Sequence, residues 1–297
     1  MASRIIHMFK KLLLIPNADD PNQPAVRRAL QCMNPATEIE VFDSVYEPML
    51  EGYLGNKEIY EPLRSRVLRE RLERAQTLAR VFADAGYEAS AHALWDHPLD
   101  RAIADEVRSK HADLVVTAPM QSHVGGLSHS DWQLVLTCPA PVLIVKSDGA
   151  AKYRRIVAAV DPFHTHAKPA DLDTAILRHA KTLQELTGAA LTVVHCFTPI
   201  SYFGADLTEL PDPRRDGREQ ALDDLLRGAG IDTAAARLVA GEPHAVLHGM
   251  VERGEADLIV MGALARGRLA QLVVGNTAER VLHRSVADVL VVKAPVV

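Results

Sequence analysis

The chain has 297 residues, a length that exceeds most single domains and suits two domains of about 150 residues each. Hydrophobic residues make up 48% of the chain and charged residues 24%, as in an ordinary soluble globular protein. The net charge of −5 argues against a nucleic-acid-binding surface.

The cysteines and the N-terminus give a first expectation about location. Cys32, Cys138 and Cys196 are few, odd in number and without metal-ligand spacing, which suits a reducing compartment. Residues 1–7 hold no long apolar region, and no segment approaches the roughly 18 apolar residues of a membrane span. We therefore expect a soluble, cytoplasmic chain that binds neither nucleic acid nor membrane.

An internal repeat decides the expected architecture. Residues 10–17 recur as 154–161 (154 − 10 = 144), residues 112–116 as 256–260 (256 − 112 = 144), and residues 142–146 as 289–293 (289 − 142 = 147). Two equal offsets and a third that is three residues longer indicate a tandem duplication. The small polar stretch at 147–151 suits a linker, so we predict domains at residues 1–148 and 152–297.

Each copy alternates predicted strands with predicted helices. Continuous apolar runs at residues 12–15, 114–116 and 142–145 are typical of strands buried on both faces of a parallel sheet. Apolar residues at helical spacing predict a helix over residues 61–85, which Gly86 ends. This alternation predicts a doubly wound α/β fold, with ligands bound beyond the carboxyl ends of the strands.

The second copy carries a candidate anion site. A predicted strand runs into Met261 and Gly262, and Gly275 precedes Asn276, which can cap a helix. Backbone N–H groups, a helix N-terminus and an arginine would then surround one small space. Asp161 ends the first strand of this copy and can accept a hydrogen bond from an adenine amine or a ribose hydroxyl. The same glycines equally fit a plain turn and a plain helix cap.

Histidines in the second copy suggest further chemistry. His244 and His248 lie four residues apart on the helix that Pro243 would begin, close enough to share a metal ion. Without a third ligand we prefer a solvated helix face, and we predict no metal site. His195 and Cys196 end a strand and are interpreted as packing residues, not as a nucleophile and its base.

The chain resembles the universal stress protein family, and its two-domain branch fits best. The resemblance rests on the tandem halves, on the segment from Gly262 through residues 275–279, on the terminal strand at 288–293, and on residues 20–29, 130–134 and 138–142. It implies two flavodoxin-like domains of the adenine nucleotide alpha hydrolase-like type. Each would have a five-stranded parallel sheet with helices on both faces. The two would pack as a pseudo-dimer that mimics the homodimer of single-domain members; a further homodimer is left open.

ATP-binding members of the family have a phosphate loop of the form Gly-x2-Gly-x9-Gly-Ser/Thr. On this chain the first and last glycines are Gly262 and Gly275, but the second falls on Ala265 and the Ser/Thr on Asn276. Alanine costs roughly 1 kcal/mol where a positive φ is required, although Gly267 can relax the turn. Asn276 lacks the hydroxyl that would bond a phosphate oxygen. These departures weaken the prediction of triphosphate binding, and that of hydrolysis more.

The sequence thus predicts at most one ligand pocket, in the C-terminal domain, with ATP or ADP as the candidate ligand. Its candidate residues are Val160, Asp161, Met261, Gly262, Ala265, Arg266, Gly267, Gly275, Asn276 and Thr277. Asp161 matches the family's adenine-contacting aspartate. In the first copy, Asn17 replaces Asp161, Pro119 removes an N–H donor, and Ser128 stands in place of the last loop glycine. We therefore predict a degenerate ligand loop in the N-terminal domain.

The predicted function is a cytoplasmic stress-response protein without catalytic residues, which binds a nucleotide or another small ligand and signals through protein contacts. A weak ATP-binding or ATP-hydrolysing enzyme is the alternative. A third interpretation is a structural scaffold with no ligand. In every case we expect the edge strands at 142–145 and 289–292 to pair domain to domain.

Overall fold

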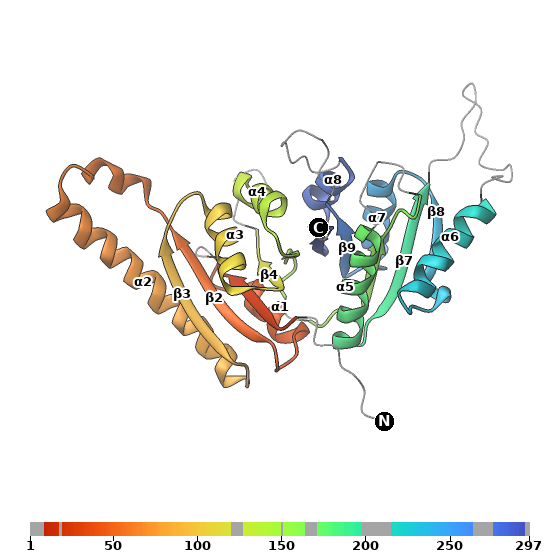
Figure 1. The fold of residues 1–297 in the computed structure, drawn as a ribbon, viewed down its shortest axis with the longest axis horizontal. Coiled ribbons are helices and arrows are strands. Elements are labelled where there is room, and N and C mark those ends of the chain that lie inside the picture. Colours follow the sequence, from red (N-terminus) through yellow and green to blue (C-terminus); the bar gives the residue numbers. More distant parts are fainter. Residues whose placement is uncertain are drawn as a thin grey trace, which may run out of the picture. The chain divides into compact units, whose positions relative to one another are not determined.

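The computed structural model describes residues 9–17, 20–119, 127–149, 151–163, 171–197, 215–263 and 276–294, with the backbone alone for residues 215, 216 and 276. The chain divides into two compact units, Met1–Ala151 (unit 1) and Lys152–Val297 (unit 2). Figure 1 shows the helices and strands of each unit. Among the described residues, no helix combines the length and the apolar character that crossing a bilayer would require.

Unit 1 is an open parallel sheet with helices packed on it. Its strands are β1 (Lys11–Ile15), β2 (Glu38–Val45), β3 (Ala89–Trp95), β4 (Leu114–Thr117) and β5 (Val142–Ile144). Its helices are α1 (Pro24–Cys32), the short 3-10 helix η1 (Pro48–Tyr53), α2 (Lys57–Asp84), α3 (Leu99–Lys110) and α4 (His129–Thr137). The strands lie in the order β3-β2-β1-β4-β5, and every pairing between them is parallel.

Unit 2 repeats this plan. Its strands are β6 (Arg155–Ala159), β7 (Ala190–Phe197), β8 (Ala236–Ala240), β9 (Leu258–Gly262) and β10 (Asp288–Val292). Its helices are α5 (Asp171–Thr187), α6 (Arg215–Gly228), the 3-10 helix η2 (Thr233–Ala235), α7 (Pro243–Glu252) and α8 (Asn276–Arg284). The strand order is β10-β9-β6-β7-β8, again parallel throughout. The predicted α/β fold of two tandem domains with five parallel strands each is confirmed.

The duplication extends to the bounds of individual elements. Strand β6 starts and ends 144 residues after β1, and α8 starts and ends 147 residues after α4. These are the two offsets found in the sequence. The units differ in their other helices, since α2 has 28 residues and α6 has 14. Positions in the two units can therefore be matched one to one around the central strands and the last two helices.

The core follows from the apolar runs. Leu12, Leu13 and Leu14 of β1 and Leu258, Ile259 and Val260 of β9 are fully buried, as expected for strands covered on both faces. The predicted helix at 61–85 is the C-terminal part of α2, which packs along β2 and β3 (Figure 1). Gly86 has a φ of +90°, a conformation that L side chains rarely adopt, so this glycine allows the chain to leave the helix.

Candidate functional site

The carboxyl edge of the unit 2 sheet brings the two predicted segments together. Strand order reverses between β6 and β9, which is the switch point where open α/β sheets bind ligands. In the parallel register of these strands, Ile156 pairs with Leu258 and Ala158 with Val260. The same register, continued for two residues, places Val160 level with Gly262. Asp161 therefore lies beside the end of β9.

Gly262 has a packing role that the sequence did not reveal. It is the last residue of β9 and pairs with Val292 of β10, so the strand continues through it. A Cβ atom built at Gly262 would come within 2.7 Å of Leu172 Cδ2 on α5. The absence of a side chain thus lets α5 approach the strand. This glycine is explained by helix–sheet packing at the edge, whichever ligand the edge binds.

Asp161 lies in a polar, half-buried environment. Its backbone N–H donates to Asp173 Oδ1 of α5 at 3.2 Å, and Asp173 is 1% exposed. One carboxylate oxygen of Asp161 lies 3.9 Å from His195 Nδ1, which is 3.2 Å from the carbonyl oxygen of Val160. The ring of Phe163, which is 45% exposed, has its centroid 5.7 Å from that of His195. The edge thus combines a carboxylate, an imidazole and an exposed aromatic face.

His195 of β7 is a neutral hydrogen-bond donor at this edge. Burial is the largest influence on its pKa and lowers it below the usual value, against the opposing effects of the Val160 carbonyl and Asp161. A neutral ring near pH 7 can donate its Nδ1–H to the Val160 carbonyl, which fixes the tautomer. The interpretation of His195 as a packing residue missed this contact, which holds the backbone next to Asp161.

The glycine loop lies largely outside the described residues. The residues that lie outside the described part of the chain are Ala265, Arg266, Gly267 and Gly275, together with the side chain of Asn276. Helix α8 begins at Asn276, and Thr277 follows, half-buried, in the first turn. The described members of the predicted pocket are thus Val160, Asp161, Met261, Gly262 and Thr277. Of these, Met261 is buried within β9.

The matching edge of unit 1 is occupied by its own side chains. Asn17, at the position of Asp161 (161 − 144 = 17), is 6% exposed and donates from Nδ2 to the Pro119 carbonyl at 3.1 Å. The Gln23 side chain donates to the Asn17 carbonyl at 2.5 Å. Ser128 caps α4 by accepting from the Asp131 N–H, while Asp131 accepts from the Ser128 N–H. The substituted residues thus have structural partners of their own.

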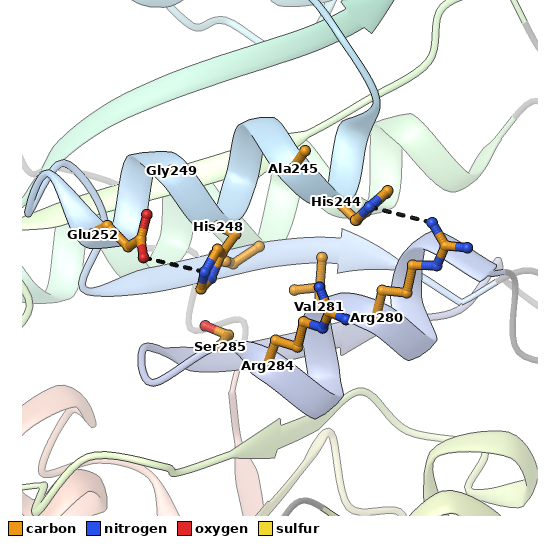
Figure 2. A pocket seen from close by; sticks show the side chains of 10 residues that line it. His244, Ala245, His248, Gly249, Glu252, Arg280, Val281, Arg284 and Ser285 are labelled. Atoms are coloured by element: carbon orange, nitrogen blue, oxygen red, sulfur yellow. Dashed lines mark hydrogen bonds and ion pairs between the residues drawn. The ribbon is translucent and has the colours of Figure 1, made fainter.

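A second feature of unit 2 is a cavity of about 170 Å³ between α7 and α8. It is lined by His244, Ala245, His248, Gly249, Glu252, Ile259, Arg280, Val281, Arg284 and Ser285. Figure 2 shows His244 of α7 facing Arg280 of α8, and His248 facing Glu252 along α7. The corresponding distances are 3.2 Å from Arg280 Nη1 to His244 Nε2, and 3.3 Å from His248 Nε2 to Glu252 Oε1.

The sequence analysis placed His244 and His248 on one helix, and α7 contains both. The preferred interpretation as a solvated face is incomplete, because both histidines line this cavity. The analysis also missed Arg284, and it did not connect Arg280 with the histidines. The available signal was the spacing, since Arg280 and Arg284 are four residues apart just as His244 and His248 are.

Unit 1 contains a buried charge cluster. The ligand-type atoms of Glu40, His92 and Glu106 all lie within 4.8 Å of one another. Lys110 Nζ is 3.1 Å from Glu40 Oε1 and 3.8 Å from Glu106 Oε1, so an ammonium group already lies beside both carboxylates. Lys11 Nζ is 3.5 Å from Glu40 Oε2. We interpret the cluster as an ion-pair network that compensates the buried Glu40.

Comparison with known proteins identifies relatives for both units. The model of the universal stress protein family matches residues 8–146 and again residues 152–293. Universal stress protein E of Photorhabdus laumondii is 26% identical over 301 residues, which cover 96% of this chain and 95% of that protein. Universal stress protein E of Escherichia coli is 26% identical over 306 residues, or 96% of this chain and 94% of that protein.

Solved structures share the fold. A Pseudomonas aeruginosa protein of unknown function superposes with a TM-score of 0.72 at 21% identity, covering 99% of this chain and 95% of that chain. A universal stress protein in complex with cAMP covers 48% of this chain at 21% identity, with a TM-score of 0.36. The Pseudomonas aeruginosa structure, at this identity, shows the shared α/β architecture. The similarity to the cAMP complex is too limited to assign a ligand to this chain.

Proposed function

The chain belongs to the universal stress protein family as a tandem two-domain member, and on this premise we propose that unit 2 is a non-catalytic binding module for an adenine nucleotide in a cytoplasmic stress response. The observation that carries the proposal is the position of Asp161. Its carboxylate lies beside the switch point between β6 and β9, where the fold offers a ligand crevice.

The groups around Asp161 suit the nucleoside part of such a ligand. A carboxylate accepts hydrogen bonds from an adenine amine or a ribose hydroxyl. The exposed ring of Phe163 offers a flat apolar surface near His195. The first turn of α8 follows the glycine loop and supplies backbone N–H groups, which favour the phosphate end. The base side of the proposed site is therefore better supported than the phosphate side.

Binding without catalysis is favoured, because the thiol and the imidazole at this edge are poorly suited to act as nucleophile and base. Burial raises the pKa of the Cys196 thiol to about 12, so this thiol stays protonated at neutral pH. Nδ1 of His195 is directed at the Val160 carbonyl, so the Nδ1 proton is used in holding the backbone. In the loop, Asn276 replaces the family's Ser or Thr. These features support a ligand sensor that signals through protein contacts, and they disfavour a hydrolase.

One ligand per chain is expected, because Asn17 and Gln23 fill the matching edge of unit 1. Calorimetric titration of the full chain with ATP, ADP and adenosine measures this stoichiometry directly. A ratio near one supports the proposal, and two equivalent sites per chain would contradict it. Phosphate release from ATP, measured in the same samples, should not exceed the rate in buffer alone.

Asp161→Asn tests the carboxylate. The loss of a charge-assisted hydrogen bond should weaken adenosine and ADP alike by about 10-fold or more. Asp224→Asn is the matched control, because Asp224 is an exposed carboxylate on α6. Equal affinities for wild type, Asp161→Asn and Asp224→Asn would disprove the assigned role. Ala265→Gly combined with Asn276→Ser restores the family loop and should strengthen ADP binding while leaving adenosine unchanged.

A further inference from the structure

The cavity between α7 and α8 contains an unusual concentration of basic side chains. Arg280 and Arg284 lie four residues apart on α8, and His244 and His248 lie four apart on α7 (Figure 2). Residues at this spacing share one helix face, so both pairs are directed at the same space. Ala245 and Gly249, each of which directly follows one of the histidines on α7, add little bulk to the cavity lining.

The arginines lack acidic partners among the described residues. The contact of Arg280 is with Nε2 of His244 at 3.2 Å, which requires the neutral form of the imidazole as acceptor. No carboxylate of the described chain lies within ion-pair distance of Arg280 or Arg284. Like charges four residues apart destabilise a helix, and an anion bound between them would remove that repulsion. The pair is therefore a guanidinium site that lacks its counter-ion.

The acidic side chain that lines the cavity, Glu252, lies at the end opposite Arg280. Glu252 is in the last turn of α7 and faces His248 Nε2 at 3.3 Å. His244 is in the first turn of the same helix, next to Arg280. Figure 2 shows the two contacts separated along the length of α7. An anion is accordingly favoured at the Arg280 end, away from the Glu252 carboxylate.

Unit 1 shows that the fold does not require these cations. The positions matching His244, His248, Arg280 and Arg284 hold Asp100, Ala104, Gln133 and Thr137 (244 − 144, 248 − 144, 280 − 147 and 284 − 147). The arginines that α3 does have are paired, because Arg108 Nη1 is 2.7 Å and Arg101 Nε 3.8 Å from Asp105. Helices α3 and α4 nonetheless pack together as α7 and α8 do. Arginines without an acidic partner at this helix pair are thus a feature that unit 2 does not share with α3 of unit 1.

We propose that the α7–α8 cavity of unit 2 is a binding site for a phosphate group, held by the guanidinium groups of Arg280 and Arg284. Its 170 Å³ equals the volume of about five or six water molecules, well below the roughly 300 Å³ or more of pockets for drug-sized ligands. That space admits a phosphate group, and the rest of a nucleotide would have to lie outside it. The planar fork of arginine suits the two-point contact that a tetrahedral oxyanion offers.

Titration of the full chain with inorganic phosphate, at constant ionic strength and pH 7.5, tests the proposal. Saturable one-to-one binding is expected, and combining Arg280→Gln with Arg284→Gln should weaken it at least about tenfold. The matched control combines Arg227→Gln with Arg237→Gln, which removes the same charge from exposed arginines that pair with carboxylates. The control should bind like the wild type. Absence of saturable binding, or an equal loss in both double variants, would overturn the proposal.

Two further arms identify the source of the phosphate and separate this site from the one at Asp161. If the site takes the phosphate of a nucleotide, AMP binds more tightly than inorganic phosphate and loses affinity in the Arg280/Arg284 variant, whether or not Asp161 is also replaced. If it takes free phosphate, the arginine variant loses inorganic phosphate alone, and adenosine affinity is unchanged. In either case Asp161→Asn leaves phosphate affinity intact, so failure at Asp161 does not count against the cavity.

Discussion

The two units build the same sheet and treat the same positions differently. At the carboxyl edge, unit 1 has a buried amide at Asn17 that is hydrogen-bonded to the Pro119 carbonyl, whereas unit 2 has a half-buried carboxylate at Asp161. On α3, unit 1 pairs its arginines with Asp105, whereas on α8 of unit 2 Arg280 and Arg284 have no acidic partner among the described residues. Duplication preserved the scaffold, and the candidate ligand chemistry is concentrated in the second copy.

The largest change in stability is expected at the buried charge cluster around Glu40 of unit 1, because the matching position of unit 2 is uncharged. Counted from the paired strands, Glu40 of β2 matches Thr192 of β7 (190 − 38 = 152, and 40 + 152 = 192). Replacing both Lys11 and Lys110 by Met leaves the buried Glu40 carboxylate without its cations. The free energy of unfolding should fall by about 3 to 5 kcal/mol, as measured by denaturant titration at pH 7.

A third substitution distinguishes the charge from the packing. Adding Glu40→Gln to the Lys11→Met and Lys110→Met variant removes the uncompensated charge and should restore most of the lost stability. A triple variant as unstable as the double variant would show that the lysine side chains stabilise unit 1 through packing instead.

The next effect concerns stability at low pH. As the pH falls, unit 2 should lose folding stability before unit 1 does. Burial, with a contribution from Arg178, lowers the pKa of His179 on α5 to about 4. Between pH 6.5 and 4 the unfolded chain therefore binds a proton that the folded chain does not. This costs roughly 3 kcal/mol across that window, and full stability returns above pH 6.5.

Hydrogen exchange measured by mass spectrometry at pH 7, 5 and 4 can follow the two units separately. The strands of unit 2 should lose protection before those of unit 1, since the described part of unit 1 has no buried histidine. His179→Leu should reduce the pH dependence of unit 2. His195, whose pKa is also lowered by burial, can leave a smaller residual slope. If unit 1 opens first, or if the slope in the variant equals that of the wild type, His179 is not the responsible group.

A smaller effect is expected at Gly262, which matches Ala118 in unit 1 (262 − 144 = 118). Gly262→Val forces Leu172 away from β9 and should lower the free energy of unfolding by about 1 to 3 kcal/mol. Adding Leu172→Ala should recover part of that loss, a non-additivity that a double-mutant cycle measures. Purely additive losses would mean that the two side chains do not compete for the same space.

The smallest effect comes from exchanging the residues at the two edges. Asn17→Asp replaces a donor to the Pro119 carbonyl with a second acceptor and should cost unit 1 about 1 kcal/mol. The reciprocal Asp161→Asn should leave the thermal midpoint of unit 2 nearly unchanged while weakening adenosine. Similar losses of stability in both variants would show that Asp161 has a structural role comparable with that of Asn17.

Much of the fold could be predicted from the sequence, because repetition and buried apolar runs are local signals. The offsets of 144 and 147 residues reappear as the spacing of β1 from β6 and of α4 from α8. The ligand site was expected beyond the carboxyl ends of the strands, and parallel pairing brings the ends of β6 and β9 together there. These features depend on backbone topology, which the periodicity of the chain determines.

The candidate sites were less predictable, because they depend on contacts between elements far apart in the chain. Gly262 was interpreted through its neighbours in sequence, whereas its constraint comes from Leu172 on α5. Arg280 and His244 are 36 residues apart, and their contact requires that α7 and α8 pack together. A motif on one element can be read from spacing, but a cavity between two helices requires their relative position.

The three cysteines provide reporters for the comparison between the units. Cys32 and Cys138 are buried in unit 1, and Cys196, half-buried in unit 2, has a thiol pKa of about 12. Burial keeps reagents from Cys32 and Cys138, and the raised pKa keeps the Cys196 thiol protonated, so all three should react slowly in the folded chain. Their rate of alkylation in the native protein then measures how often each unit opens. Peptide mass spectrometry can resolve the modified cysteines, so a wild-type chain reports the opening of both domains without any engineered probe.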